Sequence, residues 1–168
     1  VIAVGGDGTL NEVVNGYFDE SGRAINEEVA IGLLPSGTGS DFQKTLGIND
    51  LEYAISTIRA DATEAIDVAR VRLKLAAGGE GIRYLVNIST IGLGGEAVRL
   101  VNGWRHSWPA SIPGRVRFVL GALIALLRFD EQRAHLTLDD VAKHLSTGLI
   151  VVANGRFAGA GMMFAPSA

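Results

Sequence analysis

The chain has 168 residues, of which 48% are hydrophobic and 20% are charged, a composition that argues against a disordered protein. A net charge of −3 argues against nucleic acid as a partner. Cysteine is absent, which excludes disulfides and thiolate metal sites and fits a reducing compartment.

The first predicted elements are a strand over Val1–Val4, a glycine-rich turn over Gly5–Thr9 and a helix over Leu10–Phe18. Backbone N–H groups in such a turn, together with the positive end of the helix, suit a bound phosphate. Asp7 would repel phosphate, so its presence indicates a divalent cation, a transferable proton or ordered water. The alternative is an ordinary tight turn in which Asp7 or Thr9 caps the helix.

A second strand, Ala30–Leu34, runs into a loop of small and hydroxyl residues that ends at Asp41. Because two strand-to-helix turns of parallel strands lie at the same edge of a sheet, Asp7 and Asp41 are expected to face one site. Asp67 stands at the entry to the next apolar strand. Three spaced aspartates suit Mg²⁺, which prefers one or two carboxylates, water and substrate phosphates.

The pattern changes near residue 67, where we place a domain boundary between residues 1–66 and 67–168. The first part is predicted as parallel α/β, with further helices over 41–46 and 50–60. The second part is predicted to start a β-sandwich-like domain with a helical insertion. Its expected elements are a hairpin over 68–75 and 82–90, helices within 95–129, and strands near 134–139 and 147–153.

The longest apolar run is Val116–Phe129, which falls short of the ~20 residues of a membrane span. We expect a buried helix, and contact with lipid is the alternative, because arginines and tryptophans flank the run. Asn154-Gly155 is a hairpin signal that could also line a lipid pocket. His106, His135 and His144 lack metal-ligand spacing and are expected at the surface.

Five segments together resemble the diacylglycerol kinase catalytic-domain family, which includes soluble bacterial lipid kinases and the sphingosine and ceramide kinases. They cover nearly the whole chain in order, and they are GGDGTLNEVVNG (5–16), LPSGTGSDF (34–42), IDV (66–68), VNISTIGLGGEAV (86–98) and VVANGRFAGAGMMFAPSA (151–168). One departure is Ser40, which stands where the family often has asparagine.

The resemblance implies an ATP-dependent kinase that phosphorylates a lipid hydroxyl, with diacylglycerol or a sphingoid base as the acceptor. Asp7, Asp41 and Asp67 would form its catalytic network and hold Mg²⁺ through water. The nucleotide would contact the residues that match the two glycine loops, namely Gly5, Gly6, Asp7, Gly8, Thr9, Leu10, Asn11, Gly37 and Thr38.

The resemblance also implies a fragment of a longer enzyme, with the general base beyond Ala168 and the fragment itself poorly active. It implies a cytoplasmic protein that meets its lipid through transient peripheral membrane contact, and it leaves a homodimer open. Two other functions remain: an NAD-kinase-like phosphotransferase, which shares the GGDGT turn, and a non-catalytic nucleotide-binding module.

Overall fold

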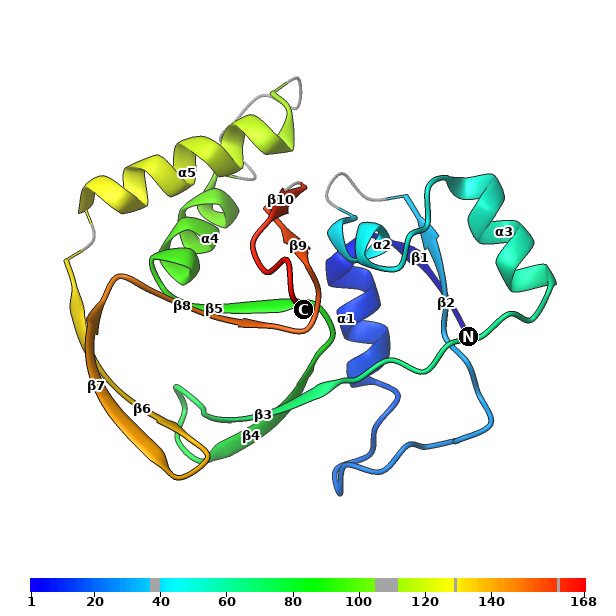
Figure 1. Cartoon of the computed structure of the whole chain (residues 1–168), viewed down its shortest axis with the longest axis horizontal. Helices are drawn as coiled ribbons and strands as arrows, with labels where there is room; N and C mark the ends of the chain where they lie inside the picture. Colours follow the sequence, from blue (N-terminus) through cyan, green and yellow to red (C-terminus); the bar gives the residue numbers. More distant parts are fainter. Residues whose placement is uncertain (37–39, 105–111, 129, 160) are drawn as a thin grey trace. The chain divides into compact units, whose positions relative to one another are not determined.

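The structure is a computed structural model, which describes residues 1–36, 40–104, 112–128, 130–159 and 161–168. The chain forms two compact units, and Figure 1 traces both along the sequence. The first unit comprises Val1–Ile88 and Ala153–Ala168, and the second unit comprises Ser89–Val152.

The first unit begins with the predicted parallel α/β arrangement. Strands β1 (Ile2–Gly5) and β2 (Gly32–Pro35) pair in parallel, with Ile2 opposite Gly32. Helix α1 (Asp7–Asn15) contacts β1, and helix α3 (Leu51–Arg59) contacts β2. The short helix α2 (Asp41–Thr45) follows the second glycine loop. The predicted α/β class is therefore confirmed.

One apolar cluster holds these elements together. It combines side chains from β1, α1, β2 and α2 with two from the segment 84–86. Its buried members are Ala3, Leu10, Val14, Leu33, Phe42, Tyr84 and Val86. Leu10 and Val14 are four residues apart on α1, so they share the helix face that covers the strands.

The predicted hairpin that follows is also present, as strands β3 (Ala69–Lys74) and β4 (Glu80–Leu85) in antiparallel pairing. It is fastened to α1 by Asn15, whose Nδ2 donates to the Tyr84 carbonyl at 2.9 Å while its Oδ1 accepts from the Tyr84 N–H at 2.9 Å. The rings of Phe18 and Tyr84 stack with centroids 4.0 Å apart. Because these contacts place the hairpin in the first unit, the predicted boundary near residue 67 coincides with neither unit limit.

The strand predicted over 82–90 is divided in two at Val86–Asn87. The Asn87 carbonyl accepts N–H groups from Asn154 at 2.8 Å and Gly155 at 3.1 Å, so the chain changes its partner there. Beyond this point β5 (Ile88–Gly92) pairs with β8 (Leu149–Ala153). The short strands β9 (Phe157–Ala158) and β10 (Met162–Met163) then pair in antiparallel fashion.

The second unit contains the predicted helical insertion as two helices, α4 (Leu93–Gly103) and α5 (Gly114–Arg128), which pack against each other. Small residues form this contact, since Ala97 and Ala125 are buried. Within the part of the chain that the structure describes, no helix combines the length and apolar character needed to cross a membrane.

A hairpin completes the second unit. It consists of β6 (Gln132–Leu138) and β7 (Val141–Thr147), joined by a two-residue turn at Asp139-Asp140. The sequence analysis expected β6 and β8 and missed β7. Its residues are mostly exposed, and Lys143 and His144 interrupt the apolar alternation on which the prediction relied.

Candidate active site

The first glycine motif places α1 directly after β1. Gly6 is the N-cap and α1 begins at Asp7, so the predicted helix start at Leu10 was three residues late. Gly5 allows this early start, because a Cβ there would collide with the side chain of Thr9 in the first helical turn. Neither Asp7 nor Thr9 acts as the cap, since no side chain caps α1.

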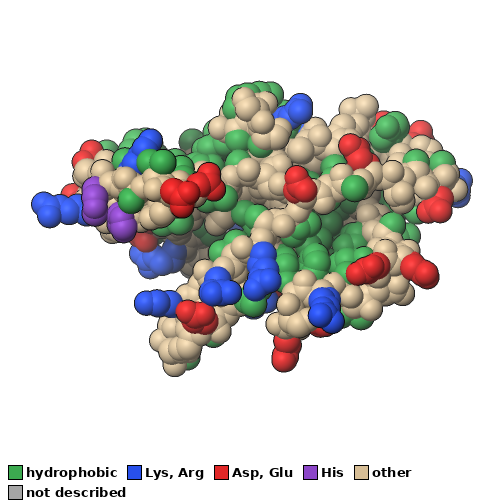
Figure 2. All heavy atoms as spheres, turned by 60° about the horizontal axis from the view of Figure 1, so that its bottom comes forward, with side chains coloured by type: hydrophobic (Ala, Val, Ile, Leu, Met, Phe, Trp, Pro, Cys, Tyr) green, Lys and Arg blue, Asp and Glu red, His purple; other side chains and the backbone are tan. Residues whose placement is uncertain are grey.

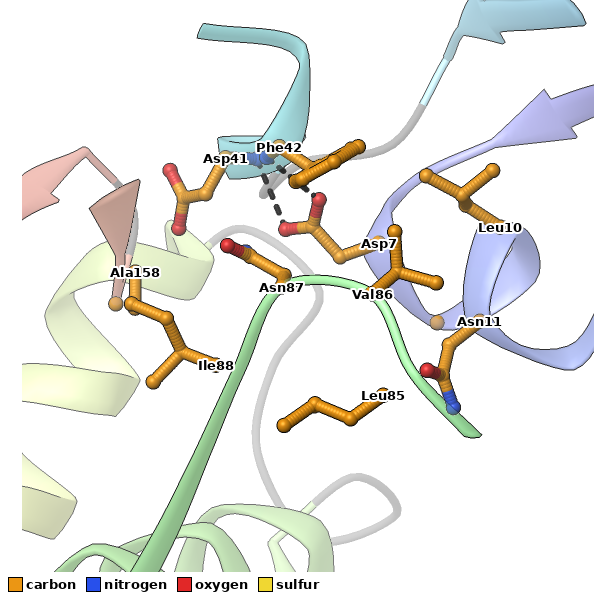
Figure 3. A pocket seen from close by; sticks show the side chains of 12 residues that line it. Asp7, Leu10, Asn11, Asp41, Phe42, Leu85, Val86, Asn87, Ile88 and Ala158 are labelled. Carbon is orange, nitrogen blue, oxygen red and sulfur yellow. Dashed lines mark hydrogen bonds between the residues drawn. The ribbon is translucent and has the colours of Figure 1, made fainter. Parts of the chain in front are cut away.

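Asp7 instead caps a different helix. Its Oδ2 accepts the Asp41 N–H at 2.8 Å and its Oδ1 accepts the Phe42 N–H at 2.9 Å (Figure 3). These N–H groups belong to the first turn of α2, which lacks intrahelical partners for its first donors. The carboxylate therefore ties the glycine turn of β1 to the helix that follows β2.

Burial raises the pKa of Asp7 above its usual range. The two backbone hydrogen bonds and the positive charge of Lys44 act in the opposite direction, and the charge of Asp41 adds to the increase. The net rise in pKa means that removal from water and the charge of Asp41 together outweigh the two hydrogen bonds and the charge of Lys44. Asp7 therefore holds a negative charge at a cost that a nearby cation would relieve.

Asp41 is the most deeply buried charged residue described, with 3% of its surface exposed. Its Oδ1 accepts from the Lys44 ammonium at 2.8 Å, three residues further along α2. The Lys44 side chain is 45% exposed, so solvent screens this pair on one side. Gly161 lies beside the ammonium, because a Cβ there would be 2.7 Å from Nζ.

Asp7 and Asp41 line the same cavity, whose volume is about 310 Å³. Figure 3 shows both carboxylates around its upper part, with the backbone of residues 85–88 crossing beneath them. A cavity of this size is large enough for a small ligand group. Its lining residues are Asp7, Gly8, Leu10, Asn11, Asp41, Phe42, Leu85, Val86, Asn87, Ile88, Ala158 and Gly159.

The structure brings together most, but not all, of the predicted site residues. Asp7, Gly8, Leu10, Asn11 and Asp41 line the cavity. Gly5 ends β1, Gly6 is the N-cap of α1 and Thr9 lies in its first turn, and none of the three is among the lining residues. Gly37 and Thr38 lie outside the described residues, so their predicted contact with a nucleotide stays a prediction.

Asp67 differs from the other two aspartates. Its side chain is exposed and does not line the cavity. Its main chain is nevertheless held near the cavity floor, since Asn154 Nδ2 donates to the Asp67 carbonyl at 2.7 Å and to the Val86 carbonyl at 2.8 Å. The catalytic role predicted for Asp67 therefore stays a prediction that this geometry does not address.

Asn87 is a lining residue that the sequence analysis did not single out. Its Nδ2 donates to the Phe157 carbonyl at 3.0 Å, which ties the cavity floor to β9. Gly155 is buried against Asn87, because a Cβ there would collide with Asn87 Oδ1 and lie 3.1 Å from Phe42 Cδ2. Asn154-Gly155 is therefore a packing element, not the turn of a hairpin, and the hairpin of this region is β9–β10.

Lys44 was also missed, although the sequence carried a signal for it. An acid and a base three residues apart on a helix lie on one face. Asn154 carried no such signal, because its partners at Asp67 and Val86 are more than sixty residues away.

The histidine prediction was incomplete. His135 and His144 are exposed as expected, but they face each other across β6–β7 with ring centroids 4.5 Å apart. Figure 2 shows the two purple side chains adjacent at the surface. His106 lies outside the described residues. Across the described ranges, no group of three or more histidine, aspartate or glutamate side chains is placed to hold a metal ion.

Comparison with known families accounts for both parts of the chain. Residues 1–71 match the diacylglycerol kinase catalytic domain. Residues 87–168 match the YegS C-terminal NAD kinase beta sandwich-like domain. Residues 1–71 are thus similar to the diacylglycerol kinase catalytic-domain family. The family resemblance and the β-sandwich-like character expected of the second part are thereby confirmed.

Named relatives agree with this assignment. The chain is 30% identical to the lipid kinase YegS of Escherichia coli strain K12 over 169 residues, which cover 100% of this chain and 52% of that protein. It is 29% identical to a probable lipid kinase YegS-like of Enterobacter sp. strain 638, again covering 100% of this chain and 52% of the relative. The chain thus spans about half the length of the curated relatives that it matches.

A solved structure supports the same fold. The crystal structure of a diacylglycerol kinase from Bacillus anthracis str. Sterne superposes with a TM-score of 0.56 at 24% sequence identity, covering 99% of this chain and 48% of the other. At this level of identity the similarity establishes the fold alone.

Proposed function

We propose that the protein is an ATP-dependent lipid kinase that transfers the γ-phosphoryl group of ATP to a hydroxyl of a diacylglycerol-like or sphingoid lipid. The observation that carries the proposal is the convergence of Asp7 and Asp41 on one cavity at the carboxyl end of the parallel strands β1 and β2. Open α/β sheets bind their ligands at this edge. The names of the relatives point to a lipid as the acceptor.

The start of α1 is the proposed site for the nucleotide phosphates. The N–H groups of its first turn lie beyond the reach of intrahelical acceptors, and the helix dipole adds positive potential. Gly8 lines the cavity within this turn, and a Cβ there would meet no atom within 4 Å. An anion can thus approach the backbone without a side chain in its way.

The two carboxylates fit a magnesium ion held through water and substrate phosphates. Each oxygen of Asp7 accepts one backbone N–H and carries a second lone pair that could accept from a metal-bound water, and Asp41 Oδ1 accepts from Lys44. Mg²⁺ characteristically keeps several waters and takes one or two carboxylates. When bound, the ion would offset negative charge on the transferring phosphoryl group.

Lys44 is the proposed source of a movable positive charge. It neutralises the buried Asp41 carboxylate when no anion is present, and its half-exposed ammonium can turn toward a phosphate at the cavity. Through its two hydrogen bonds, Asp7 would hold α2 in a fixed position beside the phosphate-binding turn, and Asp41 and Lys44 would be positioned with that helix. The chain's own residues thus orient the phosphates and manage their charge, which is most of what phosphoryl transfer requires.

The test is phosphorylation by the purified full-length protein of diacylglycerol, sphingosine and NAD in separate reactions with ATP and Mg²⁺. We expect transfer to one of the lipids and none to NAD. Asp41→Asn should lower the rate by at least about a hundredfold, as loss of a preorganised electrostatic group does. The matched control is Asp130→Asn, an exposed acid outside the cavity, which should leave the rate unchanged. Transfer to NAD alone, or nucleotide binding without transfer to any acceptor, would contradict the proposal.

A further inference from the structure

Helix α5 carries a stripe of apolar side chains that faces away from its partner helix. The stripe residues are Val116, Val119, Leu120, Leu123, Leu126 and Leu127, and their exposed fractions run from 36% to 79%. Their spacing follows the helical repeat, so they form one continuous face that covers roughly a third of the circumference. The opposite face is closed, since Ala125 is fully buried and Gly121 packs against Val101 of α4.

The exposure of this stripe contradicts the expectation of a buried helix. Isolated exposed leucines are ordinary, but six apolar side chains in one stripe form a patch of the kind that marks an interaction surface. The helix has 15 residues, which at 1.5 Å per residue is about 22 Å. It is too short to cross a bilayer and long enough to lie along its surface.

The charges on α5 identify the partner. The helix contains Arg115, Arg117 and Arg128 and no acidic residue, which gives it a charge of +3 in a chain whose net charge is −3. Helical spacing puts the exposed Arg128 on one flank of the stripe, whereas Arg117, on the same side of the helix, is half-buried with its Nε out of solvent. Asp130 and Glu131 follow the helix, outside the stripe. An apolar face flanked by the exposed Arg128, on a helix without acidic residues, matches the acyl chains and anionic headgroups of a lipid surface.

We infer that the α5 stripe docks the protein on an anionic membrane surface, with the helix lying in the interfacial plane. Leucine and valine side chains would enter the acyl region, while Arg128 would extend to the phosphates. The inference rests on the proposed function, because a kinase for a membrane-resident lipid must reach its acceptor at the bilayer. It deepens that function by naming the surface that makes contact.

The test is co-sedimentation of the full-length protein with phosphatidylcholine vesicles, with and without phosphatidylglycerol, in the absence of nucleotide. We expect stronger binding to the anionic vesicles. The double variant Leu123→Glu with Leu127→Glu should weaken this binding at least tenfold, and Arg128→Gln should weaken binding to the anionic vesicles only. The matched control is Leu138→Glu with Val141→Glu, which alters two residues of similar exposure, 58% and 57%, at the tip of β6–β7 and should leave binding unchanged.

A second measurement separates docking from chemistry. Phosphorylation of a water-soluble short-chain diacylglycerol, measured without vesicles, should be the same in the stripe variant and the wild type, which also shows that the variant folds. The inference would be overturned if the stripe variant bound vesicles as the wild type does. It would also be overturned if the substitutions changed the oligomeric state and left vesicle binding unchanged. A protein that phosphorylates the short-chain lipid but binds no vesicle overturns the docking surface alone. One that binds vesicles through the stripe but phosphorylates no lipid overturns the function alone.

Discussion

Replacing Asp7 by alanine should destabilise the fold as well as abolish activity. The carboxylate is the acceptor for two N–H groups at the start of α2, at 2.8 and 2.9 Å. Loss of a helix cap costs about 0.5–2 kcal/mol, and the loss of two part-buried hydrogen bonds puts Asp7→Ala at the upper end, near 2 kcal/mol. For a protein of this size, that change lowers the melting temperature by about 4–8 °C.

Asp7→Asn is the informative comparison. The asparagine carbonyl can accept one of the two N–H groups, whereas its amide cannot accept the other. It also removes a charge that burial disfavours, so its melting temperature should lie between those of the wild type and Asp7→Ala. Both variants should lose phosphoryl transfer, because neither has a carboxylate at the cavity.

The measurement is thermal unfolding followed by circular dichroism, with activity assayed below the lowest melting temperature. An Asp7→Ala protein that unfolds at the wild-type temperature would refute the capping role. Wild-type turnover in Asp7→Asn would refute the role of the carboxylate in catalysis.

Three further predictions concern the same region. The raised pKa of Asp7 means that the folded state holds a proton more tightly than the unfolded chain does. The unfolding free energy of the wild type, relative to that of Asp7→Asn, should therefore fall as the pH rises from about 4 through that raised pKa, and it should stay level above it. Urea unfolding of both proteins across this pH range would measure the difference. Gly155→Ala should lower the unfolding free energy by about 1–3 kcal/mol, because the added Cβ would collide with Asn87. In contrast, Gly95 lies on a helix with open space around it, so Gly95→Ala should stabilise the protein by about 0.4–1 kcal/mol. Asn154→Ala should cost about 1–3 kcal/mol, since it leaves the Asp67 and Val86 carbonyls without this donor; an unchanged denaturation midpoint would contradict that reading.

Local patterns predicted the first half of the fold well. The apolar runs before each glycine loop are strands, and the helices after them lie close to their expected positions. The convergence of Asp7 and Asp41 on one cavity was also predictable, because the carboxyl ends of neighbouring parallel strands meet at one edge. The strands and helices depend on residues within one or two turns of each other, whereas the convergence follows from a general property of parallel sheets.

The second half was predicted less accurately. The strand expected over 82–90 is two strands, β7 was missed, and the expected buried helix exposes an apolar face. In each case the sequence shows which residues are apolar, but not which partner covers them. Burial of a periodic face depends on what packs against it, and that is a property of the folded chain.

What the sequence by itself determined is the set of chemical groups and the sheet edge at which they gather: the glycine turn, Asp7, Asp41 and the family that they resemble. The tertiary structure decided how those groups are used. Asp7 caps α2, Asn87 lines the cavity with Gly155 packed against it, and Asn154 binds the main chain of Asp67, whose side chain is exposed. These contacts join residues that lie 34 to 87 positions apart in the sequence. Such distant groups meet only because the whole unit packs in one way, and a local sequence pattern does not contain that information.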